Sequence, residues 1–315
     1  MNLRAAIART RRRLSVAGGD LPTRAKHWGL AGCPHFIESP VIFSWTWLIF
    51  LLAGAQRRAA LANMRVIFPD CGALRLRWKV FRLFWNFALT ESDSGHAVAG
   101  SAQLNWELAG RSHFQRIVDS PRGAILLTAH FSNYDVASHL FARQLGRKLH
   151  TVRAPERTPE MQRLMQEQLA RVFGDAEVRV HLNTPGSMLG IDLLRALDAG
   201  EVVAIQGDRA EGAEGHVESE LFGRRCRLPR GPFALAQAAR CPIYPIFIVR
   251  SGIRRYSAHC QPPITAAATA SARRDDAQFD ELIAAWRNVL ERAIAEFWPQ
   301  WYCFQPMWDE PAESA

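Results

Sequence analysis

The chain has 315 residues, of which 48% are hydrophobic, and its 39 basic and 30 acidic residues give a net charge of +9. This length and apolar content allow one large core or two modest ones. The six cysteines lack C-x-x-C or zinc-finger spacing, which argues against a disulfide scaffold and a zinc finger. All but three of the basic residues are arginine, which suits phosphate and carboxylate partners, yet the charge alone fits nucleic acid, an anionic membrane or an acidic carrier protein.

A hydrophobic stretch, "PVIFSWTWLIFLLAGA", occupies residues 40–55. It is shorter than the roughly 20 residues that a membrane-spanning helix needs. Trp45 and Trp47 favour the headgroup zone, and arginines flank the stretch on both sides. This pattern predicts a helix that lies on, or dips into, a membrane with both ends on the cytoplasmic side. A buried core helix and a short tilted span remain alternatives, whereas a signal peptide would begin nearer the N-terminus.

The remaining predicted elements fall into two regions of the chain, which meet at about residue 100. Helical periodicity covers residues 55–68 and 74–92, so residues 1–100 are expected to form an N-terminal helical, membrane-associating region. From about residue 105, short apolar runs alternate with helical patterns. Strands are expected at 123–129, 148–154, 177–182, 201–208 and 241–250, with helices at 133–146, 159–174, 187–200, 232–240 and 276–298. Such alternation predicts an α/β domain over residues 101–315, with a central, mostly parallel sheet flanked by helices.

The segment "LLTAHFSNYD" brings His130 and Asp135 close together in the sequence. On one continuous helix, positions five apart would diverge by about 140°. The two side chains can meet if His130 ends the strand and Asp135 lies in the first turn of the next helix, and Ser132 and Asn133 are suitable N-caps for that helix. Ligands of open α/β sheets bind at this edge. The alternative is that Asp135 only caps the helix and His130 is an ordinary loop residue.

A second segment, residues 207–236, follows a strand and is rich in glycine and arginine. We read it as a long loop that ends in a helix, and long loops in compact domains are usually functional or disordered. Its arginines, which include Arg209 and Arg230, suit a phosphate or the acidic face of a carrier. A solvated basic loop without a ligand is the alternative.

These segments, in order, resemble the late (lauroyl/myristoyl) acyltransferases of lipid A biosynthesis. HFSNYD is similar to the H-x4-(D/E) motif of glycerolipid and lipid A acyltransferases. The other similar segments are "RRAALANMRVIFPD", "WNFALTESD", "VRAPERTPEMQRLM", "AIQGDRA", "LFGRRCRLPRGPFALAQAARCPIYPIFIVR" and "WPQWYCFQPMW". The resemblance spans residues 45–308. The chain departs from the family in having Asp135 where glutamate is usual, and Arg209 where glutamine is usual; both departures concern the acceptor rather than acyl transfer.

The resemblance implies transfer of a fatty acyl chain from an acyl carrier protein or coenzyme A thioester to a hydroxyl or amine of a lipid or glycolipid, as in lipid A biosynthesis. His130 would be the general base and Asp135 its partner, without a cofactor, metal or nucleic acid. Backbone N–H groups around Ser132–Tyr134 would stabilise the oxyanion. The implied substrate-binding residues are Ser132, Asn133, Arg153, Asp208, Arg209, Gly223 and Arg230. The protein is expected on the cytoplasmic face of a bacterial inner membrane. An acyl thioesterase and a non-catalytic binder of anionic membranes are the alternatives.

Overall fold

The computed structural model describes residues 35–101, 103–156, 158–173, 177–184, 186–210, 215–265 and 272–308. Seven strands form one sheet in the order β1-β9-β8-β2-β5-β3-β4. Their bounds are Asn105–Ala109 (β1), Ala124–Thr128 (β2), Leu149–Arg153 (β3), Val178–Leu182 (β4), Val202–Gln206 (β5), Ile243–Gly252 (β8) and Arg255–Cys260 (β9). Neighbouring strands are parallel except β8 and β9. The predicted α/β class and mostly parallel sheet are therefore confirmed.

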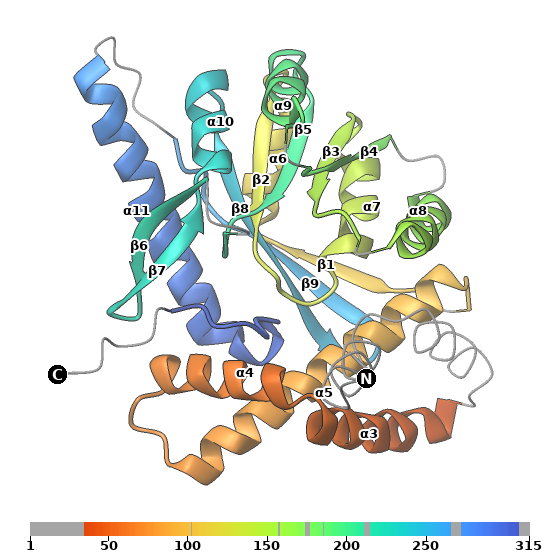
Figure 1. The fold of residues 1–315 in the computed structure, drawn as a ribbon. Helices are drawn as coiled ribbons and strands as arrows, with labels where there is room; N and C mark the ends of the chain where they lie inside the picture. Colours follow the sequence, from red (N-terminus) through yellow and green to blue (C-terminus); the bar gives the residue numbers. More distant parts are fainter. Residues whose placement is uncertain are drawn as a thin grey trace, which may run out of the picture.

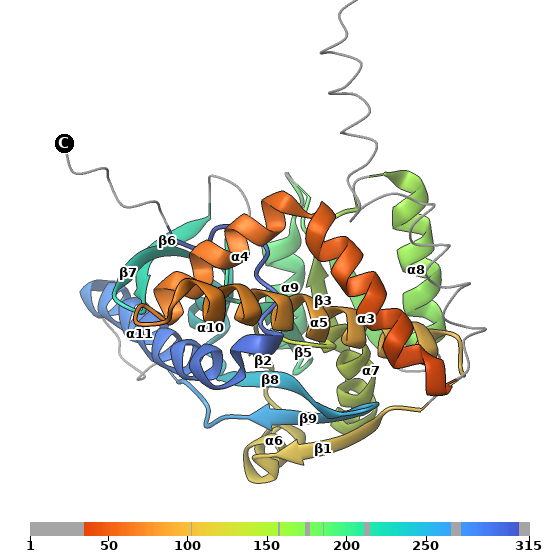
Figure 2. The same ribbon diagram turned by 90° about the horizontal axis from the view of Figure 1, so that it is seen from below.

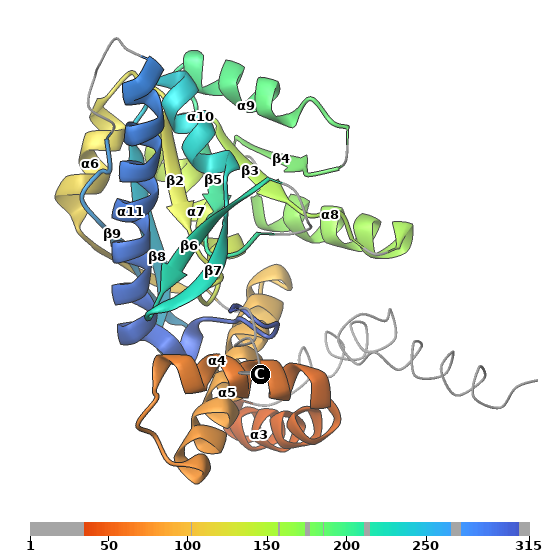
Figure 3. The same ribbon diagram turned by 60° about the vertical axis from the view of Figure 1, so that its left-hand side comes forward.

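Strand β2 lies at the centre of the sheet, and all five of its residues are buried. Because side chains alternate along a strand, Ile125 and Leu127 belong to one core while Ala124 and Leu126 belong to the other. Burial on both faces explains why this strand is a continuous apolar run. The first core includes helices α9 (Leu189–Asp198), α10 (Gly231–Ala239) and α11 (Ala272–Phe297), and the second includes α6 (Arg111–Asp119) and α7 (Tyr134–Leu145). Figures 1 and 3 show these two helical layers, with α8 (Pro159–Phe173) beside β4.

A β-hairpin occupies residues 216–229 of the segment that was expected to be a long loop, and that expectation was wrong. Strands β6 (His216–Leu221) and β7 (Arg224–Pro229) pair antiparallel. Phe222 and Gly223 form the two-residue turn, both with positive φ (53° and 69°), as hairpin turns of this length require. The alternation of buried Cys226 and Leu228 with exposed arginines along β7 is the half-buried strand pattern that the glycine and arginine content concealed. Residues 211–214 lie outside the described part of the chain.

Three helices form a separate layer across one end of the sheet, as Figures 1 and 2 show: α3 (His35–Leu52), α4 (Gly54–Ile67) and α5 (Ala73–Val98). The N-terminal region is therefore helical from residue 35, as predicted; residues 1–34 lie outside the described part of the chain. Among the described residues, no single helix is long and apolar enough to cross a bilayer. Residues 38–52 and 54–67 meet that test of length and composition only as a pair, across a 90° bend.

Buried and partly buried polar contacts fix this helical layer to the sheet. Asp93 of α5 accepts hydrogen bonds from Arg250 Nε of β8 and from the Tyr256 hydroxyl of β9, each at 2.7 Å. Burial, and then the negative charge of Asp93, raise the pKa of Tyr256, so the phenol stays protonated and remains a donor. Glu38 of α3 makes an ion pair with Arg254 at 3.0 Å. Because unpaired buried charges are costly, these pairs hold the helices in one position relative to the strand ends.

Asn63 joins α4 to the C-terminal segment, residues 298–308. Its buried side-chain amide donates to the carbonyl oxygens of Cys303 (3.1 Å) and Gln305 (2.9 Å), and its oxygen accepts from the backbone N–H of Met307 (3.1 Å). One side chain therefore satisfies three backbone groups of a segment that belongs to no strand or α-helix. The C-terminal segment is held in a single path between α4 and the sheet.

Candidate active site

The register of two neighbouring strands brings His130 and Asp208 together. In the parallel pair β2–β5, Thr128 is opposite Gln206, and each functional residue lies two positions beyond the end of its strand. His130 Nδ1 lies 2.7 Å from Asp208 Oδ1, and the His130 backbone N–H donates to Asp208 Oδ2 at 3.3 Å. Between β5 and Asp208, Gly207 packs closely on β2: a Cβ at that position would lie 2.6 Å from Leu127 Cδ1. The pair lies at the carboxyl edge of the sheet, where open α/β folds bind their ligands.

The carboxylate of Asp208 is fully buried and ionised. Burial alone would raise its pKa, but the positive charge and hydrogen bond of His130, the charge of Arg209 and a hydrogen bond from Trp301 outweigh it and lower the pKa to about 2. An ionised carboxylate only accepts hydrogen bonds, so the neutral imidazole must carry its proton on Nδ1. This leaves the lone pair of His130 on Nε2, as a general base requires.

The backbone after His130 is strained and held by the C-terminal segment. Ser132 has φ of 43°, in the left-handed region that non-glycine residues rarely adopt, and such strain concentrates at functional sites. Its N–H donates to the carbonyl oxygen of Gln300 at 3.1 Å, so it is not the oxyanion donor that was expected. Helix α7 begins at Tyr134, and the predicted break between strand and helix is confirmed. An oxyanion-stabilising role for the N–H groups of Asn133 and Tyr134 stays a prediction.

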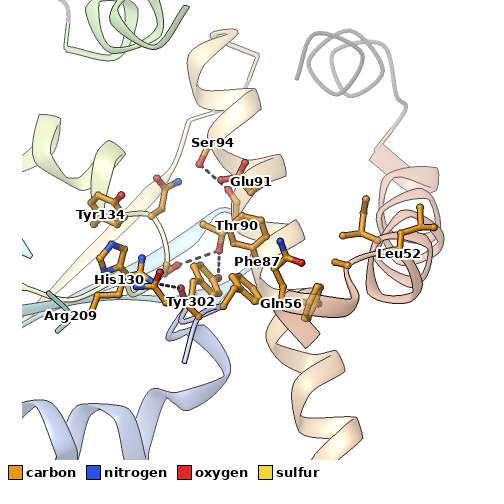
Figure 4. Close-up of a pocket in the computed structure, with 17 residues that line it drawn as sticks. Leu52, Gln56, Phe87, Thr90, Glu91, Ser94, His130, Tyr134, Arg209 and Tyr302 are labelled. Atoms are coloured by element: carbon orange, nitrogen blue, oxygen red, sulfur yellow. Dashed lines mark hydrogen bonds between the residues drawn. The ribbon is translucent and has the colours of Figure 1, made fainter. Parts of the chain in front are cut away.

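A cavity of about 530 Å³ opens beside His130. Its polar end is lined by His130, Ser132, Asn133, Arg209, Thr90, Glu91 and Ser94. Its other end is lined mainly by apolar side chains of the helical layer and the C-terminal segment: Ile49, Leu52, Phe84, Phe87 and Phe304. Figure 4 shows this sequence of side chains, from His130 and Arg209 past Phe87 to Leu52. The cavity therefore suits a molecule with a polar reacting group and an apolar chain.

The predicted site residues do not all lie in this cavity. Ser132, Asn133 and Arg209 line it with His130, whereas Arg153, Gly223 and Arg230 do not. Arg153 ends β3, Gly223 is in the hairpin turn, and the Arg230 guanidinium lies 4.8 Å from the ring centroid of Phe279 on α11.

Asp135 lies in the first turn of α7, as expected, but its side chain is outside the described residues, so its pairing with His130 stays a prediction. The carboxylate that the structure places on the imidazole is Asp208, which was predicted only to bind substrate. The aromatic and hydroxyl groups that α5 and the C-terminal segment contribute to the cavity were not predicted as site residues. Among the described residues, no group of three or more His, Cys, Asp or Glu side chains is arranged to hold a metal ion.

An imidazole beside a buried carboxylate, at the strand ends of an α/β fold and next to a partly apolar cavity, is an arrangement that suits an enzyme acting on amphipathic substrates. The family model "Bacterial lipid A biosynthesis acyltransferase" matches residues 23–310, and the chain belongs to that family. Among solved structures, it is distantly similar to the 1-acyl-sn-glycerophosphate (LPA) acyltransferase PlsC from Thermotoga maritima, with 11% identity and a TM-score of 0.34 over 81% of this chain and 98% of that chain. No curated protein is significantly similar in sequence. As a member of the family matched over residues 23–310, the protein is an acyltransferase of lipid biosynthesis.

Proposed function

We propose that the protein transfers a fatty acyl chain from a thioester of acyl carrier protein or coenzyme A to a hydroxyl of a lipid or glycolipid acceptor, as in lipid A biosynthesis. The observation that carries this proposal is His130, whose Nδ1 is occupied by Asp208 while its ring lines a cavity with an apolar far end. The free Nε2 is the base, and the apolar end accommodates an acyl chain. An amine acceptor would use the same chemistry.

In the proposed reaction, Nε2 of His130 takes the proton of the acceptor hydroxyl while the hydroxyl oxygen attacks the thioester carbonyl carbon. The new C–O bond gives a tetrahedral intermediate, and Asp208 stabilises the imidazolium. When the C–S bond breaks, Nε2 returns the proton to the thiolate, so the products are an ester and a free thiol. Arg209 lines the cavity, and its buried Nε has no hydrogen-bond partner among the described residues, which suits contact with a phosphate or the oxyanion.

The test is to incubate the purified protein with an acyl thioester, with and without a candidate glycolipid acceptor. We expect free thiol to be released together with acylated lipid, and only when the acceptor is present. Release of free fatty acid at an equal rate without acceptor would instead show a thioesterase, in which water is the acceptor. Mass spectrometry of the lipid products identifies the acylated position.

We further propose that the helical layer seats the protein on the cytoplasmic face of a bacterial inner membrane. Of the 13 large hydrophobic residues that are exposed in the described part of the chain, ten belong to α3 or α5. Leu51 is 63% and Trp78 is 56% exposed. Arg58 and Arg75 are exposed on the same helical layer and suit anionic headgroups. Leu52 both lines the cavity and is exposed on α3, so an acyl chain entering from the membrane would meet the apolar end of the cavity first.

We expect the double substitution Leu48→Asp with Leu51→Asp to lower binding to vesicles that contain anionic phospholipid by at least about tenfold, because each buried leucine contributes roughly 1.5–3 kcal/mol. The matched control is Met188→Asp. Met188 is 63% exposed, as is Leu51, but it is the N-cap of α9, a helix that lies far from α3 in Figure 1. Vesicle co-sedimentation measures the effect. Equal binding by the double variant and the wild type would contradict the membrane seat.

A further inference from the structure

The C-terminal segment, residues 298–308, lies against the residues that follow β2. Trp301 forms an isolated antiparallel bridge with Phe131. The backbone N–H of Tyr302 donates to the carbonyl oxygen of His130 at 2.8 Å, and the Gln300 carbonyl accepts from Ser132. The tryptophan-rich C-terminal segment therefore lies next to the proposed catalytic residues, although none of the proposed chemical steps uses it.

Because the indole of Trp301 binds one oxygen of Asp208, the two oxygens have different hydrogen-bond donors. Its Nε1–H donates to Oδ2 at 2.9 Å, while Oδ1 is left to His130 Nδ1 at 2.7 Å. Both Trp301 and Asp208 are 0% exposed. We propose that Trp301 is a positioning residue that fixes the rotation of the Asp208 carboxylate and so holds His130 in its catalytic orientation. This inference rests on the proposed role of His130 as the general base.

The physical reason is that a buried carboxylate must have donors for both oxygens. Without the indole N–H, Oδ2 would keep only the long 3.3 Å contact with the His130 backbone. The carboxylate would then turn toward other donors or admit water, and the hydrogen bond to Nδ1 would loosen. The same indole is one of the groups that lower the pKa of Asp208. Trp301 therefore acts on the imidazole only through Asp208.

A pair of variants isolates this hydrogen bond. Trp301→Phe removes the indole N–H and keeps an aromatic ring. Trp308→Phe is the matched control, because Trp308 is also buried (7% exposed), packs on Trp301 with ring centroids 6.2 Å apart, and donates to the backbone carbonyl of Leu221 rather than to the carboxylate. We expect kcat of Trp301→Phe to fall about tenfold with KM unchanged, as for loss of a hydrogen bond to a charged group. The Trp308→Phe variant should stay within about twofold of wild type.

Proton NMR provides a reading that does not depend on turnover. The His130 Nδ1–H proton should shift upfield in Trp301→Phe and stay in place in Trp308→Phe. In the unmodified protein, the indole N–H proton of Trp301 should resonate downfield of that of Trp308, because its acceptor is a carboxylate and not a backbone carbonyl. This last measurement tests the hydrogen bond from Trp301 to Asp208 even where Trp301→Phe does not fold.

Equal kcat values and equal Nδ1–H shifts in the two variants would overturn the inference, as would a Trp301 indole N–H proton that is not shifted downfield of that of Trp308. Failure of the proposed function is distinguishable from these outcomes. If His130→Ala kept full activity, the proposed chemistry would be wrong, while the NMR measurements would still report whether Trp301 positions Asp208 and His130.

Discussion

Asp208→Asn is expected to lower kcat by about 10⁴-fold, by analogy with loss of the carboxylate from a serine-protease triad. The asparagine amide can donate to Nδ1 of His130, which favours the tautomer that carries its proton on Nε2. That imidazole has no lone pair directed at the acceptor hydroxyl, so it cannot act as the base. Because the pKa of the native carboxylate is about 2, the wild type keeps the charged partner throughout the neutral range. Steady-state turnover of an acyl thioester with lipid acceptor measures the effect.

Asp135→Asn is the matched comparison, because sequence analysis assigned Asp135 as the partner of the same imidazole. The geometry of His130 and Asp208 predicts a much smaller loss for Asp135→Asn than for Asp208→Asn. The reverse order would identify Asp135 as the partner and give Asp208 a structural role. Both proteins should be compared by circular dichroism and denaturant unfolding, since Asp208 is fully buried.

His130→Ala is expected to reduce acyl transfer by about 10²–10⁴-fold while leaving the protein folded, because it removes the general base but no core side chain. His216→Ala is a suitable control, since His216 begins strand β6 and does not line the cavity. Added imidazole should restore part of the activity of His130→Ala by occupying the space of the missing ring. Full activity of a folded His130→Ala protein, measured as acylated lipid, would remove His130 from the mechanism.

The sequence predicted those elements whose periodicity is unambiguous. The continuous apolar run of β2 and the helix after it were placed within one or two residues, because burial on both sheet faces and a turn at Ser132–Asn133 leave clear patterns. Strands β1 and β9 were missed, since their more exposed and less exposed residues alternate over only five or six positions. The hairpin of β6 and β7 was missed because its arginines and glycines outweighed an equally short alternation.

The partner of His130 was harder to predict than His130 itself. The sequence places Asp135 five residues away and Asp208 seventy-eight residues away, and local spacing favours the nearer acid. Only the strand order shows that β5 lies beside β2, so that residues at equal offsets from Thr128 and Gln206 meet. Strand order is set by the packing of the whole domain and not by any local pattern. The role of Trp301 was beyond prediction for the same reason, although its tryptophan-rich segment was noticed.

The hydrogen bonds between Asn63 and the C-terminal segment have a consequence for the order in which this protein folds. Contacts between residues so distant in sequence close large loops, which makes them slow to form. A growing polypeptide on the ribosome has already produced His130 and Asp208 long before Trp301 emerges. The active site should therefore become functional late, after most of the sheet has formed. On refolding, the return of enzymatic turnover should lag behind the return of secondary structure.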